Sequence, residues 1–152
     1  MTRLRPMRWW HLDGVLALER DLFGAEQWTA WMFWAELAER ATRHYLIATP
    51  AAPESEDDVL GYGGLCTYGR EAYVQTLAVR RDQQGSGVGR KLLAALLAEA
   101  ARREVASVSL EVRADNAVAQ RLYAAYDFQA VGRRRGYYQP SGIDAVVMVR
   151  AG

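Results

Sequence analysis

The sequence predicts one α+β, or mixed α/β, domain that spans residues 1–152. Polar and apolar residues alternate over 107–113, which is typical of a strand buried on one face. After a glycine-rich turn at 84–89, apolar residues recur at three- and four-residue steps, as on an amphipathic helix. Strand and helix patterns follow the order βααβββαβαββ, and a chain of 152 residues can bury one core.

The first half of the chain is expected to form two strands and two helices. These are a strand over 2–7, a helix from Trp9 to a break at Gly24, a second helix from about Thr29 to Arg40, and a strand over 45–48. Thr29 is suited to the N-cap position, because its hydroxyl can accept a hydrogen bond from a free amide of the first turn. The segment 50–58 is polar and acidic and holds two prolines, so we expect a surface loop there.

The second half is expected to be richer in strands. They are predicted over 59–67 and 72–79 with a turn near Gly69, over 107–113, over 128–131 and over 145–149. A long helix should follow the turn at 84–89, and a further helix should end at Tyr126. Asp115 or Asn116 can cap that last helix.

Composition and charge exclude several classes of protein. The formal net charge of +1 favours neither nucleic acid nor a membrane surface as a partner. The N-terminal segment lacks the apolar stretch of a signal peptide, and no apolar run is long enough for a transmembrane helix. Cys66 is the only cysteine, so no internal disulfide is expected and a cytoplasmic location fits. His11 and His44 are isolated, so we expect no metal site.

The turn at 84–89, with the sequence Q-G-S-G-V-G, lies between a strand and a long helix. Glycines allow the backbone to approach a ligand closely and to adopt positive φ. Free amides at a helix start favour an anion, so a phosphate or pyrophosphate would suit this site. The alternative is a glycine-rich loop with no ligand. Two common phosphate-binding motifs, G-x-x-x-x-G-K-S/T and G-x-G-x-x-G, do not match the turn.

Further motifs surround the turn. Residues 77–79, Leu-Ala-Val, precede it, and residues 116–128 follow the pattern N-x-x-A-x-x-L-Y-x-x-x-x-F. Together with Q-x-x-G-x-G in the turn, they resemble the GNAT family of acetyl-CoA-dependent N-acetyltransferases. Residues 110–116, L-E-V-R-x-x-N, resemble the ribosomal-protein-alanine N-acetyltransferases of bacteria within that family, as do the arginines at 133–135 and the residues after them. The resemblance covers most of the chain from Glu19 to Met148.

This resemblance implies a fold and a co-substrate. The fold is a mostly antiparallel, twisted sheet with a splayed parallel pair, flanked by helices. Acetyl-CoA is the co-substrate, and no metal takes part. The pantetheine would pair with the backbone of Leu77, Ala78 and Val79. The remaining implied acetyl-CoA contacts are Gln84, Gly85, Ser86, Gly87, Val88, Gly89, Arg90 and Asn116.

Glu111 is the candidate general base. It lies on the polar face of a strand whose opposite face is apolar. A carboxylate there can take the proton of an attacking amine, directly or through a water. The resemblance implies the same role. The alternative is a surface glutamate that pairs with Arg113.

Tyr123 is the candidate general acid. A phenol with a pKa of ~10 can protonate a departing CoA thiolate, and the resemblance implies this role. The alternative is a core tyrosine beside Leu122 and Tyr126. Asn116 can likewise be a helix N-cap, a contact for acetyl-CoA, or both.

The resemblance implies that the acceptor is the N-terminal alanine of a small-subunit ribosomal protein. An α-amine has a pKa of ~8 and lysine ~10.4, so deprotonating the α-amine costs about 3 kcal/mol less. Trp28 could form a wall of the acceptor groove, although 23–28 lacks the proline common in these relatives. Arg133, Tyr137 and Tyr138 could hold a peptide or form a solvated hairpin face.

Other functions stay open. The acceptor could be lysine or a small-molecule amine, and a non-catalytic acyl-CoA-sensing module is a further possibility. The presence of both Glu111 and Tyr123 argues against that module, and a nucleotide-binding regulator is a weaker alternative. Cys66 could carry an acetyl group in a two-step mechanism. It lies inside a predicted strand with no histidine near it in sequence, so a buried apolar role is favoured.

Overall fold

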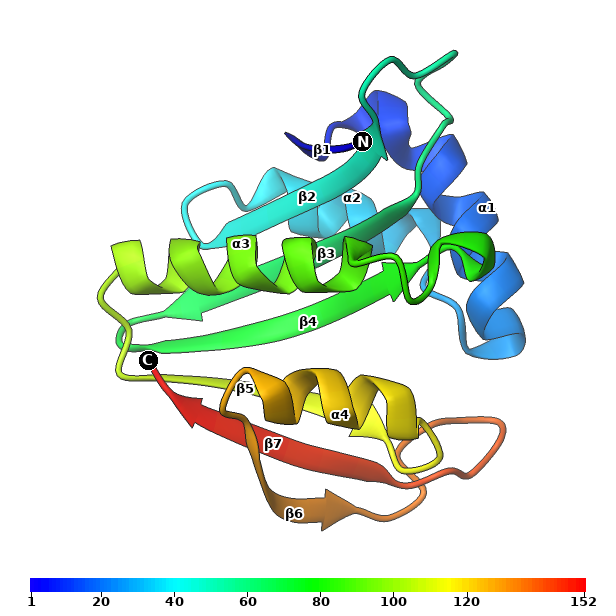
Figure 1. Ribbon diagram of the computed structural model, residues 1–152. Coiled ribbons are helices and arrows are strands. Elements are labelled where there is room, and N and C mark those ends of the chain that lie inside the picture. Colours follow the sequence, from blue (N-terminus) through cyan, green and yellow to red (C-terminus); the bar gives the residue numbers. More distant parts are fainter.

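The computed structural model describes residues 1–152 and has one seven-stranded sheet, in the order β1-β2-β3-β4-β5-β7-β6 (Figure 1). The strands are β1 (Thr2–Pro6), β2 (Arg43–Pro50), β3 (Gly61–Tyr68), β4 (Glu71–Val79), β5 (Ser107–Arg113), β6 (Gln129–Arg134) and β7 (Ala145–Ala151). All neighbouring strands are antiparallel except β4 and β5, which are parallel. The expected α+β fold and its order of elements are therefore confirmed.

Helices cover both faces of the sheet. They are α1 (Leu12–Phe23), α2 (Ala30–Ala38), α3 (Val88–Arg102) and α4 (Ala117–Ala125), with short 3-10 turns at Trp9–His11, Gly24–Glu26 and Arg81–Gln83. In Figure 1, α3 and α4 lie on one face, and α1 and α2 lie on the other. No helix is both long and apolar enough to cross a lipid bilayer.

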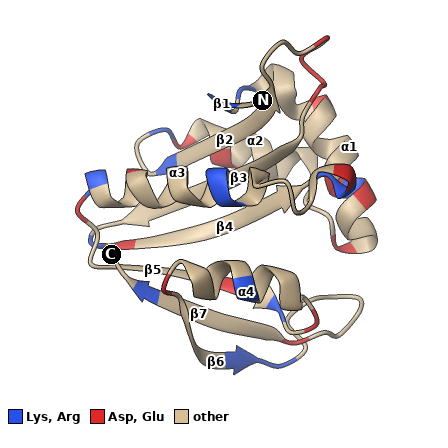
Figure 2. Ribbon diagram, in the orientation of Figure 1, with Lys and Arg blue, Asp and Glu red and all other residues tan.

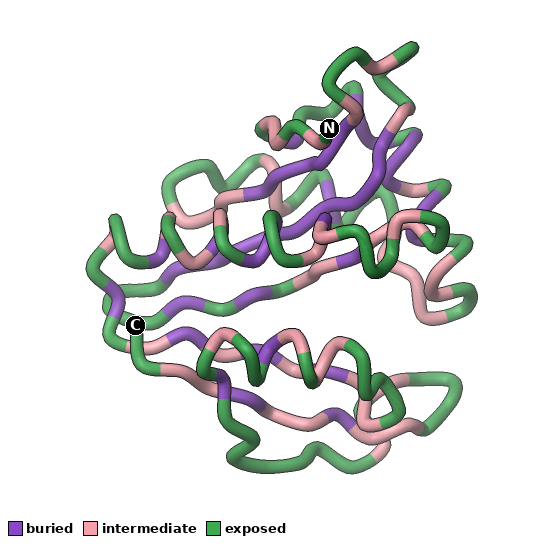
Figure 3. Tube along the Cα trace, viewed as in Figure 1, coloured by how far each residue is buried: buried purple, intermediate pink, exposed green.

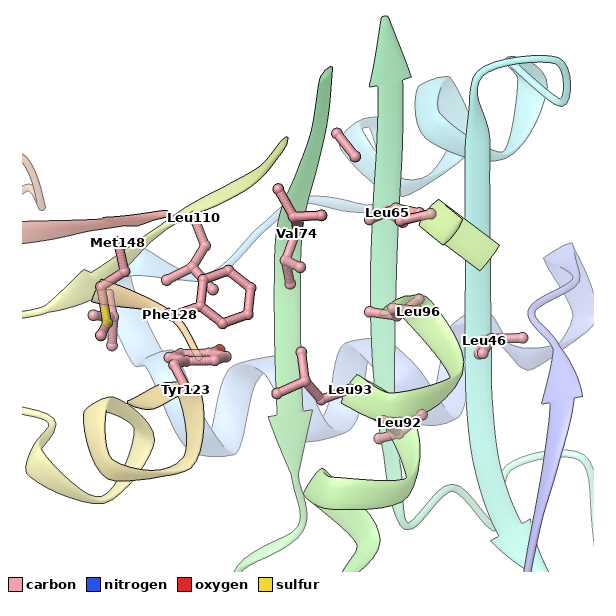
Figure 4. Packing of buried hydrophobic residues seen from close by; sticks show 14 of the residues in the cluster. Leu46, Leu65, Val74, Leu92, Leu93, Leu96, Leu110, Tyr123, Phe128 and Met148 are labelled. Atoms are coloured by element: carbon pink, nitrogen blue, oxygen red, sulfur yellow. The ribbon is translucent and has the colours of Figure 1, made fainter. Parts of the chain in front are cut away.

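Two apolar clusters fill the space between the helices and the sheet. Leu92, Leu93 and Leu96 of α3 are fully buried against the central strands, in a cluster that continues to α4 (Figure 4). The second cluster is centred on Phe33 and Ile47, under α1 and α2. Strand β2 contributes alternate residues to both clusters, so its middle part, residues 45–49, is buried on both faces, as the tube in Figure 3 shows.

The helix ends follow the expected chemistry. Thr29 Oγ1 accepts a hydrogen bond from the Met32 amide at 3.3 Å, and Asn116 Oδ1 accepts one from the Ala119 amide at 3.0 Å. Helix α1 ends at Gly24, which has a φ of +54°. Both expected N-caps are therefore present, and the break between the first two helices is a glycine conformation.

Three strands extend two or more residues beyond the prediction: β2, β6 and β7. Strand β2 continues to Pro50, because all of β1 pairs with it. The register runs from Thr2 opposite Pro50 to Pro6 opposite Leu46. Strand β6 continues to Arg134, because it pairs with β7. All six residues of β6 are exposed, so no alternation of burial marks this edge strand in the sequence.

Strands β4 and β5 are paired only at their beginnings. Their register joins Glu71–Tyr73 to Ser107–Ser109. Beyond these residues the two strands diverge, as Figure 1 shows. The rest of β4 then has no partner on its β5 side, so backbone groups along that edge stay free to bind another molecule.

Gly64 allows the closest approach between a strand and a side chain. A Cβ atom on Gly64 would lie 2.3 Å from the ring of Tyr45. We predict that Gly64→Ala lowers the free energy of unfolding by about 1–3 kcal/mol, as overpacking of a core typically does. Gly132→Ala is the matched control, because nothing lies within 4 Å of its Cβ position. Chemical denaturation measures both, and equal stability of the two variants would contradict this packing.

Candidate active site

A cleft of about 590 Å³ opens where β4 and β5 separate. Its walls come from four places: the end of β4 at 77–79, the glycine-rich turn with the start of α3, one face of α4, and the end of α1 at Leu22 and Phe23. The first three are the segments that the sequence motifs single out. The cleft therefore exists because the parallel pair splays and α3 and α4 lie on the same side of the sheet.

The glycine-rich turn forms one end of the cleft. Gly85 and Gly87 have φ values of +83° and +95°, and nothing lies within 4 Å of a Cβ placed on either. Gln84 Nε2 donates to the Val79 carbonyl at 3.0 Å and so ties the turn to β4. Gly87 is the N-cap of α3 and provides no side-chain cap. The first amides of α3 are thus free for an anion.

Three arginines line the same cleft. Arg90 is on α3, Arg121 is on α4, and Arg81 precedes the turn. Arg81 Nε also lies 3.1 Å from Asp21 Oδ2, which holds it beside α1. Figure 2 shows basic segments at the start of α3 and on α4. Free amides and guanidinium groups together fit the pyrophosphate and phosphate groups of a CoA molecule.

A second, smaller cavity of about 150 Å³ adjoins the cleft. Five residues line both spaces: Phe23, Leu77, Asn116, Ala119 and Tyr123. The second cavity adds Trp28, Tyr138 and three carboxylates, Glu19, Glu26 and Glu111. The two spaces therefore meet beside Tyr123, with acidic groups on the far side.

Glu111 lies on β5, two residues beyond its last pairing with β4. Its side chain is 31% exposed, and Glu111 Oε1 is 3.3 Å from Arg134 Nε. Arg113, the partner considered from the sequence, instead pairs with Glu26 and Asp115. The Glu111 carboxylate thus reaches the second cavity while one oxygen is held by a cation from β6.

Tyr123 lies on α4 where the two cavities meet. It is 6% exposed, and its ring is 5.7 Å from that of Phe128 in an edge-to-face arrangement, as Figure 4 shows. Burial raises the pKa of the Tyr123 phenol, and the nearby Tyr138 adds to the effect. The phenol therefore keeps its proton and can donate it. The Tyr123 ring is in the core, as the alternative reading expects, and the residue also lines both cavities, so its role as general acid stays a prediction.

Comparison with known proteins identifies the family. The profile of the Acetyltransferase (GNAT) family matches residues 8–128. The chain belongs to this family. A Mycobacterium tuberculosis protein named N-alpha-acetyltransferase RimI is 43% identical over 138 residues, which is 88% of this chain and 82% of that relative. This enzyme is accordingly an acetyl-CoA-dependent N-acetyltransferase.

Solved structures agree with this membership. The ribosomal-protein-alanine N-acetyltransferase of Escherichia coli is 29% identical, with a TM-score of 0.85 over 99% of this chain and 94% of that chain. An Arabidopsis thaliana structure in complex with acetyl-CoA has a TM-score of 0.86 over 99% of this chain and 98% of that chain. That protein is 19% identical and shows the shared fold alone.

The structure of this acetyltransferase separates the four residues proposed for acceptor binding. Trp28 and Tyr138 line the second cavity, and Trp28 packs against Phe33 with ring centroids 5.1 Å apart. Arg133 and Tyr137 do not line it. Arg133 pairs with Asp144 at 3.4 Å, and Tyr137 is 49% exposed. The two tyrosines are consecutive in the β6–β7 loop and their rings are in edge-to-face contact, but only Tyr138 lines the cavity.

The residues proposed for acetyl-CoA binding mostly gather at the cleft. All of them line it except Ser86 and Val88. The Ser86 hydroxyl donates to the Gln83 carbonyl, and the Val88 side chain is buried in the core. The Ser86 hydroxyl hydrogen is thus already used within the turn, and Val88 can offer a ligand in the cleft only its backbone. Asn116 is the α4 N-cap and lines both cavities.

Sequence reasoning missed Glu19. This carboxylate is 1% exposed on α1, accepts a hydrogen bond from the Tyr62 hydroxyl at 2.5 Å, and accepts another from the Trp28 amide at 2.7 Å. Burial raises the pKa of Glu19, although both hydrogen bonds act to lower it. The sequence does offer one signal for a buried carboxylate, because Glu19 stands among the apolar positions of the helix. Glu19 fixes the backbone of Trp28 at the wall of the second cavity.

Cys66 is fully buried on β3 and lies outside both cavities. Burial raises the pKa of its thiol, so it stays in the neutral, unreactive form. No group of three or more His, Cys, Asp or Glu side chains gathers in a way that could hold a metal ion.

We predict that Gly87→Glu abolishes acetyl-CoA binding, because a side chain and a negative charge would enter the anion cradle. Gly69→Glu is the matched control. Gly69 also has a positive φ, at +58°, and open space around its Cβ position, but it lies in the β3–β4 turn. Isothermal titration measures both. Normal affinity in a folded Gly87→Glu variant would contradict the cradle.

Glu19→Gln should stabilise the protein more at pH 7 than at pH 4. At pH 4 the carboxyl is largely protonated in both the folded and unfolded chain, so its burial has little effect. As pH rises above about 4.5, the unfolded chain loses this proton first, which lowers the stability of the native state. The variant removes that pH-dependent loss. Melting curves at both pH values test it, with exposed Glu39→Gln as the control, and a pH-independent difference would contradict the prediction.

Proposed function

We propose that the enzyme acetylates protein N-termini, with the N-terminal alanine of a small-subunit ribosomal protein as its acceptor. The observation that carries the proposal is the meeting of the two cavities beside Tyr123, with Glu111 on the acceptor side. An acetyl group delivered along the cleft would reach an amine that enters from the second cavity. We place the reaction in the cytoplasm, where ribosomal proteins are made.

The cleft would bind acetyl-CoA mainly through its backbone. The free edge of β4 at 77–79 would pair with the amide groups of pantetheine, and the turn at 84–90 would hold the pyrophosphate. Arg81 and Arg121 would add positive charge that the sequence motifs do not reveal. The amides at the end of β4 would polarise the thioester carbonyl by hydrogen bonding to its oxygen.

Glu111 would act as the general base. It removes one proton from the acceptor ammonium, and the neutral nitrogen then attacks the carbonyl carbon of the thioester. As the new C–N bond forms, the C–S bond breaks and the sulfur takes the electron pair. The acetylated nitrogen then loses a second proton to solvent and becomes a neutral amide, and Glu111 releases the first proton to solvent. No covalent enzyme intermediate is needed, which agrees with the burial of Cys66 away from both cavities.

Tyr123 would act as the general acid. Its phenol donates a proton to the sulfur as the C–S bond breaks. Burial raises the pKa of Tyr123, which weakens it as an acid. The same dry environment also disfavours a free thiolate, so protonation of the sulfur becomes more favourable. The phenol regains its proton from solvent before the next turnover.

Several features support a protein N-terminus over lysine as acceptor. The second cavity is small, which suits an amine with a short first side chain. An α-amine also needs less help to lose its proton than lysine does. The names of the relatives point the same way. We propose that Trp28 and Tyr138 flank the first residue and that Arg133 and Tyr137 contact the peptide farther out.

A peptide panel tests this function. Peptides that differ only in their first residue, together with an N-terminally blocked peptide that contains lysine, are incubated with acetyl-CoA and analysed by mass spectrometry. We expect acetylation of the α-amine, fastest with alanine. Acetylation of lysine or of small amines alone would replace this proposal with that acceptor class. Acetyl-CoA binding without any transfer would favour an acyl-CoA sensor.

We predict that Glu111→Gln lowers the turnover number about 10²–10⁴-fold near pH 7. Affinity for acetyl-CoA should change little, because the base acts on the amine. The deficit should shrink as pH rises, since more of the amine is already neutral. Arg134→Gln is the matched control, because it removes the same ion pair and leaves the base. Equal losses in both variants would mean that the ion pair matters and the base does not.

Tyr123→Phe should lower turnover while acetyl-CoA binding and the ring packing against Phe128 persist. Tyr126→Phe is a control at the C-cap of the same helix, at a residue that lines neither cavity. Rates and melting curves are measured on the same preparations. Full activity in a stable Tyr123→Phe variant would remove this phenol from the mechanism.

A further inference from the structure

A chain of polar side chains leads from α2 to the acceptor cavity. Glu36 on α2 accepts a hydrogen bond from Arg43 Nε at 3.0 Å and from the Tyr45 hydroxyl at 2.7 Å. The Tyr45 hydroxyl also lies 2.8 Å from Oε1 of Gln75 on β4. Gln75 lines the second cavity, as does Glu111. The buried Tyr45 thus connects Glu36 to Gln75, an exposed residue at the second cavity.

The direction of these hydrogen bonds follows from counting hydrogens. A tyrosine hydroxyl has one, so Tyr45 cannot donate to both Glu36 and Gln75. Glu36 pairs with Arg43, so it is a carboxylate and can only accept. Burial and the charge of Glu36 raise the pKa of Tyr45, which keeps its proton for that bond.

Tyr45 must therefore accept its second hydrogen bond. The two ends of a glutamine amide are assigned from their hydrogen-bond partners, and here only the nitrogen of Gln75 satisfies the hydroxyl. With the amide turned in this way, Gln75 Nε2 faces Tyr45. The oxygen of Gln75 is then directed away from Tyr45 and is free to accept a hydrogen bond.

Resting on the proposed function, we infer that the Gln75 amide oxygen accepts an N–H hydrogen bond from the acceptor amine, and that Tyr45 and Glu36 are positioning residues. Once Glu111 has taken a proton, a primary amine keeps two N–H bonds. One of them bonded to Gln75 would direct the lone pair of the nitrogen to the thioester carbon. An amide is neutral and does not compete with Glu111 for the proton, and it favours an amine over an acceptor without N–H groups.

A double-mutant cycle tests this inference in the full-length enzyme. Gln75→Leu should lower kcat/KM for the peptide about 3- to 10-fold, which corresponds to one net hydrogen bond, with no change in affinity for acetyl-CoA. Tyr45→Phe should give a smaller loss. The double variant should match Gln75→Leu, because the hydroxyl acts only through the amide. Tyr68→Phe, which keeps its ring over Arg43, is the control.

A purely structural role for Tyr45 would give a different pattern. Its loss would lower the melting temperature and leave kcat/KM of the folded enzyme unchanged in both backgrounds. Unchanged kcat/KM in Gln75→Leu, with active wild-type enzyme, would overturn the inference and leave the proposed function intact. A wild-type enzyme that acetylates no N-terminus would instead overturn the proposed function.

The amide orientation is measurable without any acceptor. The side-chain N–H of Gln75 that bonds to Tyr45, observed by nitrogen-15 NMR, should exchange with solvent more slowly in the wild-type protein than in Tyr45→Phe. Equally fast exchange in both proteins would contradict the orientation, and with it the inference, whichever acceptor the enzyme uses.

Discussion

Parallel pairing between β4 and β5 stops after three residues on each strand, and the rest of the site depends on this limit. A longer ladder would satisfy the backbone edge at 77–79 and would close the cleft. Because α3 and α4 cover the same face on either side of the split, the first turn of α3 and the cavity-lining side of α4 face one space. The antiparallel pairs on both flanks hold the two halves of the sheet in place.

Three carboxylates line the second cavity, and neighbouring groups limit their effect on the stability of the fold. Glu26 and Glu111 each have an arginine partner, Arg113 and Arg134. Glu19 has only hydrogen bonds, from Tyr62 and the Trp28 amide, and burial raises its pKa. A carboxylate in that position lowers stability at neutral pH, which is consistent with a site shaped by function more than by stability.

Most of the fold can be predicted from the periodicity of apolar residues in the sequence, and the position of the cleft can be predicted from the sequence motifs. The alternation over 107–113 and the leucines of α3 identify their elements, because each buries one face. The strand predicted for β6 ends too early, because both faces of β6 are exposed and its residues show no alternation of apolar and polar side chains. It missed Glu19, Glu26 and Gln75 as cavity residues, because their positions depend on contacts between segments far apart in the chain. Local sequence patterns do not reveal such contacts. For the same reason, the sequence does not show that Tyr138 lines the cavity while Tyr137 is exposed to solvent.

The most direct test is a crystal structure with a bisubstrate analogue in which CoA is joined through an acetyl bridge to the nitrogen of an alanine-initiated peptide. The account predicts that the bridge lies where the two cavities meet, with the sulfur beside the Tyr123 hydroxyl and the peptide nitrogen on the Glu111 side. The pyrophosphate should lie on the amides of the turn at 84–90. A peptide that enters from elsewhere, or a sulfur remote from Tyr123, would contradict the account.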